Sequence, residues 1–113
     1  MSPEVAGDCG LRLDGRAVRL GCRLGADTLL VVLDLAVHAV DTPEGPLVAA
    51  SYRDVARRVG ISKDTVGRRM AILRNMGVVM ERPESPADRF DVRSYRLRLE
   101  LAGVSRLAGP AAA

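Results

Sequence analysis

Aromatic side chains are almost missing from this sequence. Its 113 residues include one Phe, two Tyr and no Trp. The length suits one compact domain, and an apolar content of 48% is enough for a core and too high for a disordered chain. The core must therefore be aliphatic, and large aromatic anchors are nearly excluded from any binding surface.

Cysteine and histidine are also scarce, since the chain has only Cys9, Cys22 and His38. Their spacing fits no common metal site, so we expect neither a metal nor another cofactor. The sequence also lacks a nucleophile–base pair, a Gly-rich phosphate loop and a pair of carboxylates on one face, which argues against an enzyme. A redox switch at the two cysteines and a pH or ligand sensor at His38 beside Asp34 are minor alternatives; reduced, buried thiols and a polar interface edge are the commoner explanations.

No secretory signal and no membrane span are visible. The N-terminus, MSPEVAGDCG, has no apolar run. The longest apolar run, LLVVLDLAVHAV at 29–40, is interrupted by Asp34 and His38, and it is shorter than the roughly 20 residues that a bilayer requires. We therefore expect a cytoplasmic protein, associated with the nucleoid if it binds DNA.

The positive charge is concentrated in one segment. The net charge is only +3, yet residues 51–82 carry seven arginines and one lysine against three acidic residues. Residues 1–50 have a charge of −3, and residues 83–113 have a charge of +1. A polyanion-binding surface gives this uneven distribution, and nucleic acid is the partner it indicates.

Residues 9–24, CGLRLDGRAVRLGCRL, alternate between apolar and polar around Asp14-Gly15. Asp-Gly between alternating segments is a strong signal for a type I′ hairpin turn. The pattern predicts an N-terminal β-hairpin, and we assign residues 1–26 to it as an extension. One face of this hairpin would carry Cys9, Leu11, Leu13, Val18, Leu20, Cys22 and Leu24.

A helix is predicted from 27 to 40, with Asp27 or Thr28 as its N-cap. This helix is apolar almost all round, so it should be buried on more than one side. Because so short a chain has difficulty covering such a helix, we expect a homodimer through helix 27–40, the N-terminal hairpin, or both. The breaker-rich stretch 41–46, DTPEGP, reads as a loop.

Two further helices lie in SYRDVARRVGISKDTVGRRMAILRNMGVV at 51–79. Ser51 with Asp54 resembles a capping box, and Gly60 ends the first helix. Ser62 caps the second helix, which Gly77 ends.

Two strands follow these helices. Residues 78–82 are predicted as a strand and 82–89 as a turn-rich tip, with the loop lasting until about Arg93. Residues 94–101 alternate as a second strand. Residues 102–113 are expected to form a flexible tail.

This order resembles the winged helix-turn-helix DNA-binding proteins, in the broad style of the MarR and GntR transcriptional regulators. The residues that match the family pattern are Ala56, Gly60, Ile61, Ser62, Thr65, Val66, Leu73 and Gly77, followed by a wing, ERPESPADR. The resemblance covers about 27–101 and implies an α+β fold of three helices and a β-wing. The N-terminal hairpin is not part of the pattern, and we expect no separate ligand-binding or catalytic domain of the GntR kind in these residues.

The resemblance and the charge pattern together indicate which residues contact double-stranded DNA. Helix 62–76 would enter the major groove with its N-terminal residues at the base edges, and wing 82–93 would grip the adjacent backbone or groove. The expected contact residues are Ser51, Arg53, Ser62, Lys63, Asp64, Thr65, Arg68, Arg69, Arg82, Arg89 and Arg93.

Individual roles follow from the side-chain chemistry. Arg68 is placed to fork onto a guanine, and Asp64 could accept from a cytosine amino group or orient Arg68 one turn later. Ser51 and Arg53 would contact the backbone, while acidic residues in the wing dilute its charge. The expected role is transcriptional regulation; a plasmid or mobile-element replication or partition factor, and a winged-helix protein–protein adaptor, remain open as alternatives.

Overall fold

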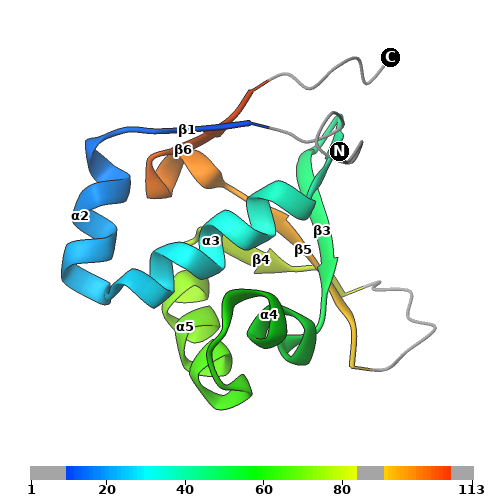
Figure 1. Ribbon diagram of the computed structural model, residues 1–113. Coiled ribbons are helices and arrows are strands. Elements are labelled where there is room, and N and C mark those ends of the chain that lie inside the picture. The colour runs from blue at the N-terminus through cyan, green and yellow to red at the C-terminus, as the bar shows by residue number, and fades with distance from the viewer. Residues whose placement is uncertain (1–9, 84–90, 108–113) are drawn as a thin grey trace, which may run out of the picture.

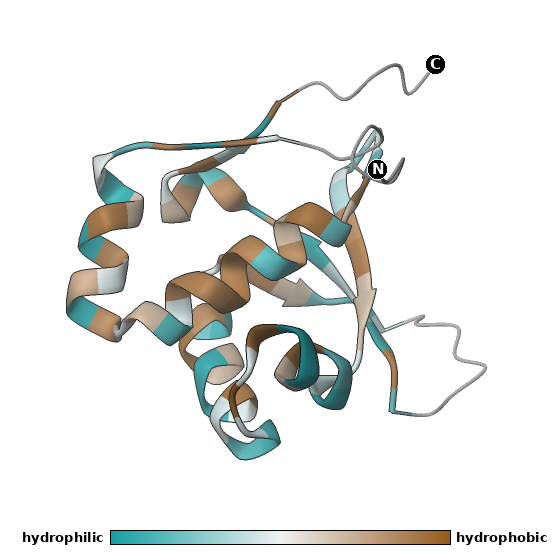
Figure 2. Ribbon diagram, in the orientation of Figure 1, coloured by the Kyte–Doolittle hydropathy of each residue, from teal (hydrophilic) through white to brown (hydrophobic). Residues whose placement is uncertain are grey.

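Helix α3 (Ala26–His38) crosses the middle of the molecule and is the element around which the others pack (Figure 1). The computed structural model describes residues 10–83 and 91–107. One side of α3 lies fully inside the core, and most of the α3 ribbon is coloured hydrophobic in Figure 2, with a few hydrophilic bands. The buried residues of this helix are Thr28, Val31, Val32, Leu35 and Ala36.

Three helices and an antiparallel sheet make up the predicted winged helix. After α3 come α4 (Tyr52–Val59) and α5 (Lys63–Asn75), which lie together on one side of it (Figure 1). The sheet has the order β2-β3-β5-β4. Its strands are β2 (Val40–Thr42), β3 (Gly45–Ala50), β4 (Val79–Glu81) and β5 (Arg93–Leu97). The expected α+β winged helix-turn-helix fold is confirmed.

The predicted helix boundaries of the motif are also confirmed. The Ser51 hydroxyl accepts from the Asp54 amide at 3.1 Å, and the Ser62 hydroxyl accepts from the Thr65 amide at 3.0 Å. Gly60 ends α4 with φ 86°, a left-handed conformation that favours glycine. Because both helices are capped by their own sequence, the turn between them is fixed locally.

The N-terminal hairpin prediction is wrong. Residues Gly15–Leu24 form a helix, α2, and Asp14 is its N-cap, accepting from the Arg16 amide at 2.8 Å. The strand before it, β1 (Leu11–Leu13), pairs instead with β6 (Val104–Arg106) near the C-terminus. Ala17 and Leu20 are buried at a helical spacing of three, whereas Val18, expected beside Leu20 on one hairpin face, is 61% exposed.

The C-terminal prediction is wrong in part. The last sheet strand stops at Leu97, and a 3-10 turn, η1 (Leu99–Ala102), redirects the chain into β6. Leu101 consequently turns outward, although alternation had placed it with the buried residues. Residues 104–106 of the expected tail are ordered by pairing with β1, and residues 108–113 lie outside the described part.

Three local expectations around α3 are corrected. The helix starts at Ala26 after Gly25, so neither Asp27 nor Thr28 is its N-cap; the Thr28 hydroxyl donates to the Leu24 carbonyl at 2.8 Å. It ends at His38, and Val40 already belongs to β2. The predicted loop 41–46 is mostly strand, because β2 and β3 form a hairpin with Thr42 opposite Gly45. No helix in the described residues is long and apolar enough to cross a membrane.

Candidate nucleic-acid interface

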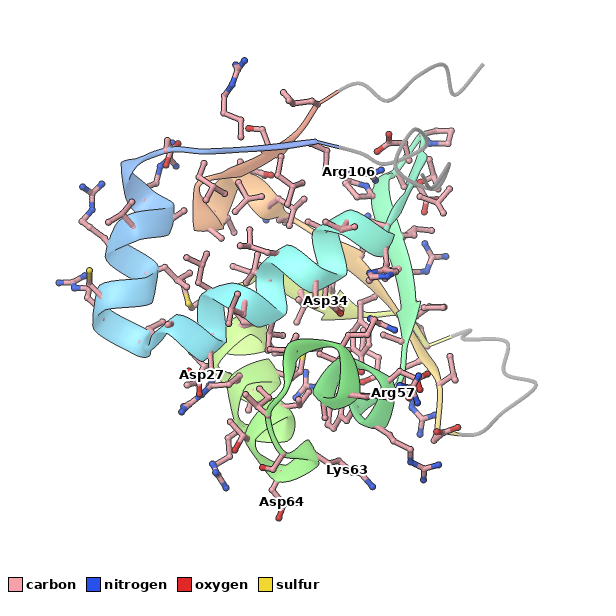
Figure 3. All side chains as sticks on the ribbon, viewed as in Figure 1. Asp27, Asp34, Arg57, Lys63, Asp64 and Arg106 are labelled. Atoms are coloured by element: carbon pink, nitrogen blue, oxygen red, sulfur yellow. The ribbon has the colours of Figure 1, made fainter. Side chains whose placement is uncertain are left out.

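The N-terminal turn of α5 protrudes at one end of the molecule. Lys63 and Asp64 extend outward there, as Figure 3 shows, and both are exposed. Arg68 follows one turn later and is also exposed, with its Nη2 donating to the Thr65 hydroxyl at 3.2 Å. The Ser62 hydroxyl donates to the same Thr65 oxygen at 2.8 Å. Thr65 therefore holds Arg68 against the first turn of the helix.

A shallow groove runs along this exposed face of α5. Its floor is formed where Gly67 and Ala71, which lack long side chains, lie beside Tyr52 of α4. A Cβ at Gly67 would lie 3.5 Å from the Tyr52 ring, so the two helices approach closely at this point. Lys63, Asp64 and Arg68 stand along the groove as its polar groups.

A second hollow of about 230 Å³ opens between the starts of α4 and α5 and the strands of the wing. Its cationic residues are Arg53, Lys63 and Arg93, and all three are exposed. Glu81 also lines it, 3.3 Å from Arg93. Asp91 is a second acidic residue of the lining, so three cations and two carboxylates share one concave surface at the starts of two helices.

Tyr52 and Tyr95 form the inner wall of that hollow. Burial raises the pKa of the Tyr95 hydroxyl, and Tyr52 beside it raises that pKa further. The Tyr52 hydroxyl accepts a hydrogen bond from Arg74 Nη2 at 3.3 Å. The Tyr95 phenol therefore carries no charge near neutral pH, and it does not repel an anion.

Two of the predicted contact residues are turned into the fold. Ser51 is only 2% exposed and its hydroxyl is used as the α4 cap. Arg69 Nε donates to the Asp27 carboxylate at 3.1 Å, which ties α5 to α3. Both side chains therefore have a partner inside the fold, and DNA contact by Ser51 or Arg69 stays a prediction.

The wing arginines are partly neutralised within the protein. Arg82 lies 2.7 Å from Glu44 of the β2–β3 turn, and Arg93 lies 3.3 Å from Glu81. Arg89 falls outside the described residues. The sequence had indicated that acidic residues dilute the wing charge, and the two described arginines are indeed paired.

Tyr52 is the interface residue that the sequence analysis missed. It was not among the expected contact residues, yet it lines both the groove and the hollow. The only signal was Gly67, a glycine inside a helix, which often marks a close packing partner. Nothing in the sequence identified that partner, because the contact joins two different helices.

Residues 49–80 match the family described as winged helix-turn-helix DNA-binding. The matched stretch runs from the end of β3 through α4 and α5 to β4, and it contains the groove. This part of the chain is thus similar to winged helix-turn-helix DNA-binding proteins, the resemblance that its residues had predicted. The match does not distinguish MarR from GntR regulators. No curated protein and no solved structure matches the chain.

Proposed function

We propose that this winged helix-turn-helix protein binds specific sequences of double-stranded DNA and regulates transcription, with α5 in the major groove. The observation that carries the proposal is the division of cations within the matched segment. Lys63 and Arg68 are exposed along the groove, whereas Arg58 and Arg69 pair with carboxylates of α3. Lys63 and Arg68 are therefore left available to a ligand on the exposed face of α5.

Phosphate contacts would come from the hollow between α4 and α5. Arg53 and Lys63 stand at the first turns of two helices whose N-terminal amides favour anions. Arg93 approaches the same hollow from β5 and can exchange Glu81 for a phosphate. These contacts would fix the position of the protein on the duplex without reading its sequence.

Base reading would fall to Arg68 and Asp64. The Thr65 hydroxyl, rather than Asp64, holds Arg68, and no ion pair joins Asp64 to Arg68 within the described chain. Arg68 can then fork onto O6 and N7 of a guanine, and Asp64 can accept from a cytosine amino group. The two side chains lie one helical turn apart and so would read neighbouring positions.

A homodimer completes the proposal, and the predicted hairpin is no longer a candidate for its interface. The protein covers most of α3 with its own α2, α4 and sheet. The part of α3 that remains exposed to solvent belongs to an apolar strip beside α4, formed by Leu30, Leu33, Val37 and Val59. Leu30 and Val37 are 47% and 41% exposed, so a second copy could bury them and pair two α5 helices on a symmetric site.

Fluorescence anisotropy across a salt series tests the function. The probes are duplex DNA from the upstream region of the gene encoding this chain and a scrambled duplex of equal composition. Tighter binding to the upstream duplex with a steep loss of affinity in salt is expected, since several phosphate contacts release counterions.

Other outcomes change the assignment. No binding to any duplex at low salt would reject the function and favour a protein–protein adaptor. Equal affinity for both duplexes would contradict specific reading of the upstream region. Mapping the bound sites in the genome then separates a regulator, with sites at promoters, from a replication or partition factor, with repeated sites at an origin.

A further inference from the structure

A third hollow lies away from the groove, between α2, the C-terminal end of α5 and η1. It has a volume of about 240 Å³. Its apolar part is formed by Leu20, Leu24, Met76 and Leu101. Met76 and Leu101 remain 38% and 37% exposed, although large apolar side chains gain free energy when they leave water.

Three arginines of α2 line the same hollow: Arg16, Arg19 and Arg23. Their spacing of three and four residues places them on one helix face. Arg16 lies 3.8 Å from Asp14 and donates to the Glu100 carbonyl at 3.2 Å. Within the described residues, Arg19 and Arg23 have no hydrogen-bond or ion-pair partner.

This charge arrangement works against the stability of α2. Like charges three and four residues apart repel one another, and the only acidic residue at this helix end within the described residues is the N-cap, Asp14. Four arginines stand in the twelve residues Arg12–Arg23, although the first fifty residues are acidic as a whole. Arg19 and Arg23, without a partner among the described residues, lie beside exposed apolar side chains, and this combination suits a ligand that has both characters.

The shape of the hollow selects among possible ligands. Duplex DNA would meet the arginines but would gain nothing from four apolar side chains. A bilayer surface could not reach a recessed floor, because the apolar side of α2, Ala17 and Leu20, is buried in the core. A small molecule fits both parts, with its apolar body in the hollow and its anionic group on Arg19 and Arg23.

We propose that this hollow binds a small amphipathic anion, meaning a short alkyl or aryl body that ends in a carboxylate or similar group. The site is independent of the DNA-binding surface and does not rest on the function proposed above. Its ligand would touch Met76, the residue that follows α5.

Methionine methyl groups report directly on this site. The chain has four methionines, and in the described part Met70 is buried while Met80, 41% exposed, lies outside the hollow. The protein labelled with ¹³C at methionine methyls is titrated with sodium octanoate and followed by NMR. A saturable shift of the Met76 resonance is expected, with Met80 unchanged as the internal control.

Matched probes and variants separate the two parts of the interaction. Octylammonium keeps the alkyl body and reverses the charge, and acetate keeps the carboxylate alone; neither should shift Met76. The double variant Arg19→Gln/Arg23→Gln should weaken octanoate binding about tenfold or more, since it removes two charge-assisted bonds. Arg57→Gln, on the exposed side of α4, should leave the affinity unchanged.

Three results would overturn the proposal. One is an equal response to octylammonium, and another is a Met80 shift as large as that of Met76, because both indicate non-specific adsorption. The third is unchanged octanoate affinity in the double variant. Should the double variant not fold by circular dichroism, the single variant Arg23→Gln is titrated in its place and must also bind more weakly.

Discussion

Neighbouring arginines of α5 have opposite surroundings. Arg68 is exposed beside the groove, and Arg69 is tied to Asp27 of α3. Arg68→Ala should weaken binding to the specific duplex by about 1–3 kcal/mol and relax discrimination at one base position. Arg69→Ala should leave DNA affinity nearly unchanged and lower stability by less than about 1 kcal/mol, since its ion pair is partly exposed.

Anisotropy with a set of single-base variants of the duplex, together with urea unfolding of both proteins, checks this contrast. If Arg68→Ala reduces affinity by the same factor on every duplex, Arg68 contacts phosphate instead of a base. If Arg69→Ala is the variant that loses affinity, the orientation of α5 proposed here is wrong.

Gly103 shows how one residue joins the two ends of the chain. Its φ is 74°, and its carbonyl accepts from the Asp14 amide at 2.9 Å. A Cβ at this position would lie 2.5 Å from the Ala17 amide nitrogen and would also collide with the Asp14 carboxylate. Gly103→Ala should therefore lower the free energy of unfolding by at least about 2 kcal/mol, since steric overlap adds to the unfavourable φ.

Gly60→Ala is the matched control for that substitution. Gly60 also has a positive φ, 86°, but no atom lies within 4 Å of an added Cβ. Gly60→Ala should lower the free energy of unfolding by only about 1–2 kcal/mol, since backbone strain is its only penalty. If urea unfolding gives the same decrease in the free energy of unfolding for both variants, the contact between Gly103 and the start of α2 does not contribute to stability.

At the scale of whole elements, the predictable parts are those whose ends are fixed by nearby residues. The helices α4 and α5 have Ser caps and glycine stops within the segment itself, so the sequence indicates both. Residues 9–24 satisfy a strand pattern and a helix pattern at once, since Leu20 and Leu24 fit either. Asp14 begins a hairpin turn in one reading and caps α2 in the other. The choice depends on β6, about 90 residues away, which no local pattern contains.

The solvent exposure of the site residues on α5 was predictable from the sequence, whereas their ion pairs were not. Exposure of Lys63, Asp64 and Arg68 follows from the helical period of α5 alone. The partners of Arg69 and Arg82, which are Asp27 and Glu44, come from other elements. Charge in the sequence therefore indicated a DNA-binding surface, but it could not show which arginines the fold itself engages.

Helix α2 gives a prediction about stability. Arg19 lies between Arg16 and Arg23 on one face, in the middle of α2. Arg19→Gln should raise the free energy of unfolding by about 0.5–1 kcal/mol, because it removes two like-charge contacts. Thermal unfolding at low salt measures this increase in stability, and added salt should reduce the difference between the variant and the original protein.

Arg57→Gln is the matched comparison on α4. Arg57 donates to Asp54 at 3.1 Å and stands in the last turn, where a cation is favourable. Its removal should lower stability by about 0.5 kcal/mol or less. A loss of stability in Arg19→Gln would contradict the view that the α2 arginines repel one another.

Considered as a whole, the molecule is a winged helix whose two chain ends are used to cover α3. Strands β1 and β6 pair, and α2 packs against α3. Elements of the same chain therefore bury most of the apolar surface of α3 that the sequence analysis had expected a second copy to bury. The exposed remainder is the apolar strip beside α4, where Leu30 and Val37 are about two helical turns apart. The proposed interface between two copies would use this strip.

Because the proposed interface lies on this strip, two variants test the dimer. Leu30→Glu/Val37→Glu should give a monomer by multi-angle light scattering, because four carboxylates would face one another in a symmetric interface. The double variant should also bind a single half-site as well as the original protein does while losing the extra affinity for a paired site. Val18 is also exposed and apolar, but it belongs to α2, so the Val18→Glu variant should remain a dimer. A monomeric original protein at high micromolar concentration would exclude the dimer, and a paired operator would then have to be read by two independent copies.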